Sequence, residues 1–271
     1  MSVESKVKFT KIGFSERLKS MLRVDFRRMM RSRLFYILIA IALVMPVLMT
    51  VMMTMMDGTV SKDPQTGIET VMRGPENVWQ NIGTLPGVEA MGGSEVFMMC
   101  NINMMFMAVA VFVCLFIADD FRCGYAKNLF TVRAERGEYV ISKTVAGFVT
   151  GALMLIAYFI GAIIGGAISS LSFDLHGLGG YNVIMCLLSK IFLMLVFVSI
   201  FTVISIAAKS RAWLSICASL GGGMLLFMTV SLITPLESTV INALLTLVGG
   251  LLFAVGLGAI SRVILKKTSL V

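Results

Sequence analysis

Six long apolar runs constrain the fold of this chain more than any other feature of its sequence. Each run is about 20 residues or longer and nearly free of charge, and about 20 apolar residues suffice for an α-helix to cross a bilayer core. The composition agrees, because 58% of the 271 residues are hydrophobic, 14% are charged and the mean hydropathy is +0.92. A soluble globular domain has a different balance. The sequence therefore predicts an all-α polytopic membrane protein.

The expected membrane domain covers residues 34–265 and contains six transmembrane helices. A cytoplasmic basic leader, 1–33, precedes it, and a large extracytoplasmic loop, 57–95, separates the first two spans. Because the first apolar run follows the leader and is long enough to stay in the membrane, we expect no cleavable signal peptide. The six expected spans are residues 34–56, 96–118, 144–169, 181–208, 212–233 and 240–264.

The basic residues lie in alternate segments between these spans. Ten Lys and Arg residues fall within 1–33, and five fall between Asp119 and Lys143. The turn at Lys209–Arg211 holds two more, and the tail after residue 261 holds three. Loops rich in Lys and Arg stay in the cytoplasm. We therefore expect a protein of the plasma membrane with both termini on the cytoplasmic side. The net charge of +8 thus reports topology, and we expect lipid and not nucleic acid as a partner.

The last part of the leader has the pattern of an amphipathic helix. Between Phe14 and Met30, apolar residues recur at steps of three and four, with basic residues between them. Such a helix is suited to the membrane interface, where its basic face meets anionic headgroups. The alternative is that these charges only orient the chain in the membrane.

A few polar or helix-bending residues interrupt the apolar runs. Pro46 should bend the first span, as a packing feature or as part of a pathway. Asn101 and Asn103 near the outer end of the second span favour hydrogen bonds between helices. For Lys190, within the fourth span, we expect the side chain to reach outward to the interface; the alternative is a place in a polar pathway.

Several kinds of chemistry are missing from the sequence. There is no Gly-x-x-x-x-Gly-Lys-[Ser/Thr] motif for binding ATP. The single histidine and the five scattered cysteines provide neither a metal site nor a disulfide framework. We therefore expect a chain that is not an enzyme, has no catalytic or metal-binding residues and holds no cofactor.

A charged segment, Asp119–Lys143, joins the second and third spans and is expected to be a cytoplasmic loop. It has five basic and four acidic residues, more than a simple connection needs. Phe121, Tyr125 and Leu129 recur every four residues, which predicts a short helix with one apolar face. That face would insert into a groove of a partner protein, or alternatively lie in lipid.

The charged segment, DDFRCGYAKNLFTVRAERGEYVISK, resembles a loop of the ABC-transporter type-2 permeases, the membrane subunits of many bacterial exporters. That family typically has an acidic residue, Gly and Lys-Asn-Leu, followed by Arg-x-x-[Tyr/Phe]-x-x-x-Lys at the next span. The chain departs from it at Tyr125–Ala126, where the family more often has Thr-Ile. The matching residues are Asp120, Gly124, Lys127, Asn128, Leu129, Arg136, Tyr139 and Lys143.

The resemblance implies a permease that moves a substrate outward with a partner. A coupling helix in the charged segment would dock on a separate cytoplasmic ATPase, which would bind ATP and magnesium. Two permease subunits, identical or different, would form the pathway for a peptide, an antibiotic or another amphipathic substrate. The expected docking and coupling residues are Asp119, Asp120, Phe121, Arg122, Gly124, Tyr125, Lys127, Asn128, Leu129, Arg136, Tyr139 and Lys143.

Two other functions remain open at this point. One is a membrane sensor or immunity protein that transports nothing and binds a peptide through the acidic outer loop, 57–95. The other is a secondary transporter, although the acidic residues lie outside the expected span interiors, where proton-driven transporters usually carry them.

Overall fold

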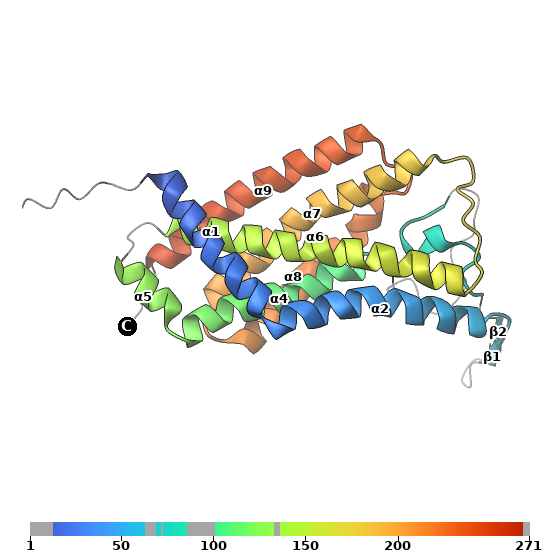
Figure 1. Ribbon diagram of the computed structural model, residues 1–271, viewed down its shortest axis with the longest axis horizontal. Coiled ribbons are helices and arrows are strands. Elements are labelled where there is room, and N and C mark those ends of the chain that lie inside the picture. The colour runs from blue at the N-terminus through green and yellow to red at the C-terminus, as the bar shows by residue number, and fades with distance from the viewer. Residues whose placement is uncertain (1–12, 63–68, 72, 86–100, 133–135, 268–271) are drawn as a thin grey trace, which may run out of the picture.

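The computed structural model describes residues 13–62, 69–71, 73–85, 101–132 and 136–267. Long helices run side by side along the long axis of the molecule, and one helix crosses them obliquely at one end (Figure 1). The helices are α1 (Phe14–Arg31), α2 (Arg33–Met55), η1 (Val78–Asn81), α4 (Met104–Arg122), α5 (Tyr125–Val132), α6 (Gly137–Ile168), α7 (Gly180–Ala208), α8 (Ala212–Ile233) and α9 (Val240–Lys267).

Five of these helices, α2, α4, α6, α7 and α9, are long and apolar enough to cross a membrane. The chain is therefore a multi-pass membrane protein. The fifth predicted span, residues 212–233, corresponds to α8, whose apolar stretch Ala212–Phe227 is shorter, so the count of six spans stays a prediction. The predicted start of the second span, residues 96–100, lies outside the described residues, and α4 begins at Met104.

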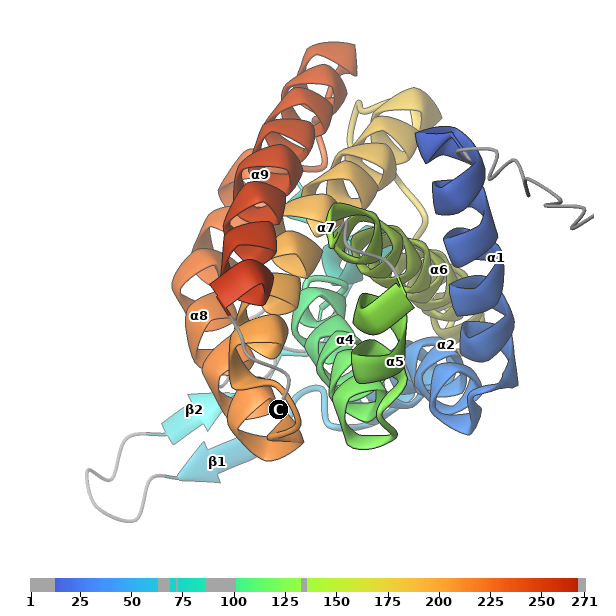
Figure 2. The same cartoon turned by 90° about the vertical axis from the view of Figure 1, so that its left-hand side faces the viewer.

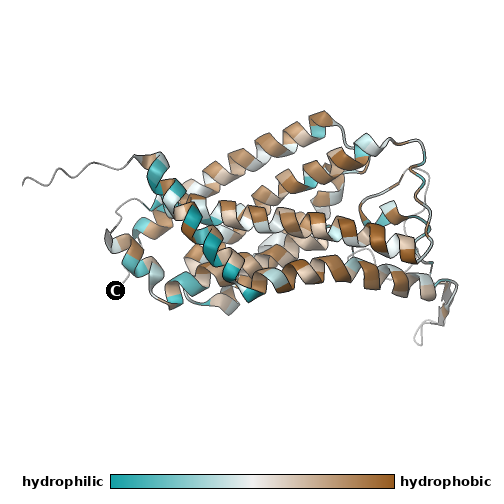
Figure 3. Cartoon of the chain, in the orientation of Figure 1, coloured by the Kyte–Doolittle hydropathy of each residue, from teal (hydrophilic) through white to brown (hydrophobic). Residues whose placement is uncertain are grey.

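The two ends of the bundle differ in chemistry. At one end, which we call the basic end, lie α1, α5 and the last turns of α9 (Figure 1). Figure 3 shows hydrophilic residues along α1 and α5, whereas the long helices are mostly hydrophobic. At the opposite end, the antiparallel strands β1 (Val60–Lys62) and β2 (Glu69–Val71) extend beyond α2.

The core is built around α7, which packs against α4, α6, α8 and α9. Large aromatic side chains fill the space between α4 and α7: Phe106 and Phe197 are buried, with ring centroids 4.8 Å apart. On the other side of the bundle, α2 packs along α6. The helices α8 and α9 lie on the outside and expose many apolar side chains, as lipid-facing helices do.

Close contact between α2 and α6 depends on glycine. A Cβ atom at Gly161 would lie 2.7 Å from Pro46 Cγ and closer still to the carbonyl oxygen of Leu43. One turn later, Gly165 faces Val47 in the same way. The Gly-x-x-x-Gly pair thus lets the two backbones meet, and Pro46 lies in this contact as a packing residue.

We predict that Gly161→Ala destabilises the protein by about 1–3 kcal/mol, because the added methyl group forces α2 away from α6. The measurement is the thermal unfolding midpoint in detergent. Gly256→Ala in α9 is the matched control, since a Cβ atom there meets nothing within 4 Å. Equal midpoints for the two variants would contradict the close-contact interpretation.

Candidate functional site

The basic end holds a cluster of four charged side chains, which we call the charge cluster: Asp25 and Arg28 of α1, Asp120 of α4 and Lys143 of α6. The Lys143 ammonium lies 2.7 Å from Asp25 Oδ1 and 2.7 Å from Asp120 Oδ2. Arg28 Nη1 lies 2.6 Å from Asp120 Oδ1. Two positive and two negative charges therefore join three helices that are far apart in the sequence.

Three of the four members of the cluster are buried, while the Arg28 side chain is 30% exposed, and the carboxylates receive further hydrogen bonds. Asp25 and Asp120 are 0% exposed and Lys143 is 1% exposed. Ser142 donates its hydroxyl proton to Asp25 Oδ2 at 2.5 Å, and the Tyr139 hydroxyl donates to Asp120 Oδ2 at 2.9 Å. A buried ion pair is tolerated only when its charges and remaining lone pairs are satisfied in this way.

Aromatic rings extend the cluster towards α5. The Lys143 ammonium lies 4.1 Å from the centroid of the Phe116 ring, and the Arg28 guanidinium lies 4.6 Å from that of Tyr125, the first residue of α5. Burial alone would lower the pKa of Arg28, but the Asp120 carboxylate and then Asp25 raise it above its ordinary value. The guanidinium therefore stays charged and links α1 to α4 and α5.

Asp25 was not among the site residues predicted from the sequence, although a signal was present. Asp25 occupies the middle of a stripe formed with Met21 and Met29, and all three are buried. An acidic residue in the apolar stripe of an otherwise basic helix indicates a buried cationic partner. A second pair, Arg17 with the buried Glu138 at 2.8 Å, also holds α1 to α6.

The charged segment contains the predicted short helix, α5, but the expectation that its two ends form a loop was wrong. Its beginning, Asp119–Arg122, forms the last turn of α4, and residues 137–143 form the first two turns of α6. Between them lies α5, separated from α4 by a turn in which Gly124 has a positive φ of 72°, a conformation that favours glycine. Arg133 lies outside the described residues.

The predicted apolar docking face also needs correction. Phe121 belongs to α4, whereas Tyr125 and Leu129 belong to α5, so the three do not share one helix. Phe121 and Leu129 are partly buried against the protein's own core. The apolar side of α5 packs against the rest of the molecule. Neither lipid nor a partner protein is therefore needed to cover it. Among the side chains of residues 125–131, the exposed ones are polar: Lys127, Asn128 and Thr131.

Two further predicted residues of the segment, Arg122 and Arg136, have partners elsewhere in the chain. Arg136, just before α6, donates to the carbonyl oxygen of Leu265 near the end of α9, and its guanidinium lies 5.3 Å from the Phe130 ring centroid. Arg122 Nε donates to the carbonyl oxygen of Ser210 at 3.2 Å. Asp119 is exposed. The segment thus touches the turn between α7 and α8 and the end of α9.

Lys190 does not reach outward, as expected from the sequence, but is 0% exposed inside the bundle. Its ammonium donates to Asn103 Oδ1 at 2.8 Å and to Thr234 Oγ1 at 3.0 Å. Asn103 in turn donates to Ser231 Oγ at 3.0 Å. The residue before α4 and the residue after α8 therefore offer Lys190 polar acceptors inside the protein, so its side chain does not need to extend to the membrane interface. Asn101 accepts a bond from the backbone N–H of Asn103 at 2.8 Å.

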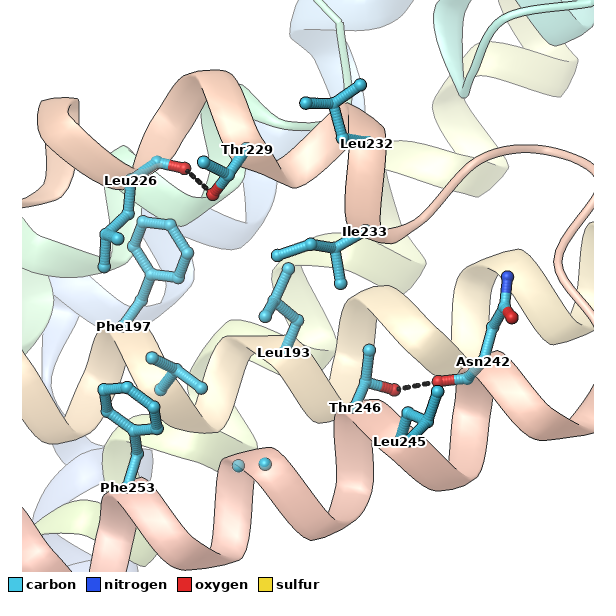
Figure 4. A pocket seen from close by; sticks show the side chains of 13 residues that line it. Leu193, Phe197, Leu226, Thr229, Leu232, Ile233, Asn242, Leu245, Thr246 and Phe253 are labelled. Carbon is cyan, nitrogen blue, oxygen red and sulfur yellow. Dashed lines mark hydrogen bonds between the residues drawn. The ribbon is translucent and has the colours of Figure 1, made fainter.

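An apolar cavity of about 450 Å³ lies between α7, α8 and α9. Figure 4 shows Phe197, Leu226 and Phe253 among the side chains that line it. Two threonines in the wall donate to carbonyl oxygens of their own helices, Thr229 to Leu226 and Thr246 to Asn242. The wall therefore presents mainly hydrocarbon and suits an apolar group.

We predict that Lys143→Met destabilises the protein by about 3–5 kcal/mol, because two buried carboxylates then face each other without their shared cation. Lys266→Met, at an exposed position of α9, should change the stability by less than about 0.5 kcal/mol. Denaturant or thermal unfolding in detergent measures both. A Lys143→Met variant as stable as the control would contradict the structural role of the cluster.

For the second buried lysine, we predict a rescue. Asn103→Leu removes an acceptor from the Lys190 ammonium and should cost at least about 2 kcal/mol. Adding Lys190→Met should recover part of this loss, because the cation that lacks its acceptor is also gone. Thermal unfolding of the single and double variants tests this. Additive losses would show that Lys190 does not depend on Asn103.

Comparison with protein families identifies the family of this chain. A family model described as "ABC-2 family transporter protein" matches residues 21–226. This range starts within α1, ends within α8 and includes all four members of the charge cluster. Comparisons with curated proteins and with solved structures gave no match.

Proposed function

The chain belongs to the ABC-2 family of transporter proteins, and from this premise we propose that it is the permease subunit of an ATP-binding-cassette exporter. Two such subunits would form the pathway. A separate ATPase would bind ATP and magnesium and supply the energy, which agrees with the absence of a phosphate-binding motif from this chain.

The observation that carries this proposal is the charge cluster. It connects the ends of α1, α4 and α6 through ion pairs of 2.6–2.7 Å, and Tyr125 brings α5 into contact with Arg28. A push on α5 would therefore move the ends of three helices together. Rigid-body movement of packed helices is one established way to switch a protein between two states.

The exposed face of α5 is the proposed docking surface for the ATPase. It presents Lys127, Asn128 and Thr131, while the apolar side of the helix lies against the bundle. Such a face would recognise a polar surface carrying acidic groups. Charge complementarity of this kind sets orientation and association rate more than affinity.

The remaining features extend the proposal to topology and substrate. The basic end would lie in the cytoplasm with both termini, because Lys and Arg concentrate there, and the outer loop would lie on the opposite side of the plasma membrane. We count α8 as a further membrane span, which would bring the total to six. The apolar cavity between α7, α8 and α9 supports an amphipathic substrate such as a peptide or an antibiotic.

We predict that Lys127→Glu weakens co-purification with the ATPase and lowers its stimulation by about tenfold, because the charge at the centre of the docking face is reversed. The chain should still fold, since Lys127 is exposed. Lys267→Glu, exposed at the end of α9, is the control and should leave both quantities unchanged. Docking through α5 would be contradicted if Lys127→Glu matched the unmodified protein in co-purification, ATPase stimulation and transport.

A further inference from the structure

The helix α1 carries two sets of basic residues with different surroundings. Arg17 and Arg28 pair with buried carboxylates, those of Glu138 at 2.8 Å and Asp120 at 2.6 Å. The other set is exposed, and we call it the basic stripe: Lys19, Arg23, Arg27 and Arg31.

The basic stripe lies opposite the buried side of α1. Its members are four residues apart, and three of them precede Met21, Asp25 and Met29, the buried residues of the helix, by two positions each. Two residues correspond to about 200° around an α-helix. The stripe therefore points away from α6, against which α1 packs.

The stripe has no neutralising partner within the described part of the chain. None of its four side chains has a carboxylate oxygen within 4.0 Å there. Like charges four residues apart destabilise a helix, and the stripe contains three such pairs. An anion from outside the protein would remove this repulsion.

The position of α1 indicates where that anion lies. In Figure 2, α1 runs along the outer flank of the bundle beside α6, whereas α5 lies at the end that faces the viewer. The stripe thus faces sideways, away from the surface that α5 presents. Exposed apolar residues accompany it: Val24 and Met30 are 40% and 50% exposed, and Tyr36 and Ile37 at the start of α2 are 53% and 54% exposed. This mixture of basic and apolar exposed residues fits a membrane interface.

We propose that the basic stripe binds the phosphate groups of anionic lipids in the leaflet at the basic end. Three of its four residues are arginines, whose planar guanidinium groups bind phosphate oxygens in pairs. Successive members of the basic stripe lie about 6 Å apart along the helix axis, so the stripe contacts several headgroups at once. The stripe is therefore a lipid-binding surface that distinguishes anionic from neutral lipids.

Lipid binding at the stripe also stabilises the charge cluster. Asp25 and Arg28 lie on the same helix as the stripe, on its opposite side. A ligand that binds only the native position of α1 stabilises that position by mass action. Anionic lipid therefore favours the state in which α1 is locked to α4 and α6. This effect of lipid requires only the chain itself and is independent of the proposed ATPase.

The test uses the purified full-length chain in nanodiscs of phosphatidylcholine alone or with added phosphatidylglycerol. Retained lipid is quantified by mass spectrometry, and thermal unfolding is measured in parallel. The stripe variant is K19Q/R23Q/R27Q/R31Q. The control K209Q/R211Q/K266Q/K267Q removes four exposed basic residues from other parts of the same end, and R23K/R27K/R31K keeps the charge of the stripe.

We expect the lipid retained by the unmodified protein to be enriched in phosphatidylglycerol. In the stripe variant this enrichment should be lower by a factor of about five or more. The control and the Lys-substituted variant should retain most of it, and added salt should reduce it. Phosphatidylglycerol should raise the unfolding midpoint of the unmodified protein but not of the stripe variant. Without anionic lipid, the stripe variant should be at least as stable as the unmodified protein, because the repulsion is gone.

Three results would overturn the proposal. The stripe variant could keep the full enrichment, or the control could lose as much of it, in which case only net charge matters. If the stripe variant kept its phosphatidylglycerol enrichment but no longer co-purified with the ATPase, the stripe would bind a protein partner and not lipid. Failure of Lys127→Glu to affect the ATPase, by contrast, would bear on the proposed docking and leave the lipid result unaffected.

Discussion

The position of Lys143 between Asp25 and Asp120 is the interaction on which the basic end of this protein depends. Its ammonium is within 2.7 Å of both carboxylates and almost fully buried. Removal of the cation would leave two negative charges close together where water does not screen them. The contact therefore fixes α1 and α4 relative to α6. The contact between Tyr125 and Arg28 then holds α5 against these helices.

This arrangement divides the surface of the basic end by chemistry. The apolar side of α5 and the inward side of α1 are used within the molecule, whereas exposed polar and basic residues remain outside. Figure 2 shows α5 at the end of the bundle and α1 along its flank, so the exposed side of α5 and the basic stripe of α1 belong to different parts of the surface. A protein partner and a lipid headgroup would thus meet two separate surfaces that share the same internal ion pairs.

The two buried lysines show how differently one residue type is accommodated. Lys143 has two carboxylates at the basic end, where α1, α4 and α6 meet. Lys190 has neutral acceptors from Asn103 and Thr234, which join α4, α7 and α8. In the described part of the chain, α4 thus contributes to both polar junctions through its two ends. A displacement of α4 would disturb both junctions.

The sequence by itself determined the class of protein, most of the helices and the importance of the charged segment, because long apolar runs and concentrated charge are local properties of a chain. It also identified Asp120, Tyr139 and Lys143, but not that they bind one another. Only the tertiary structure decided that Asp25 completes their cluster, that α5 hides its apolar side and that Lys190 stays inside. Each of these depends on which distant helix supplies a partner, and helical periodicity states which side of a helix is buried but not against what.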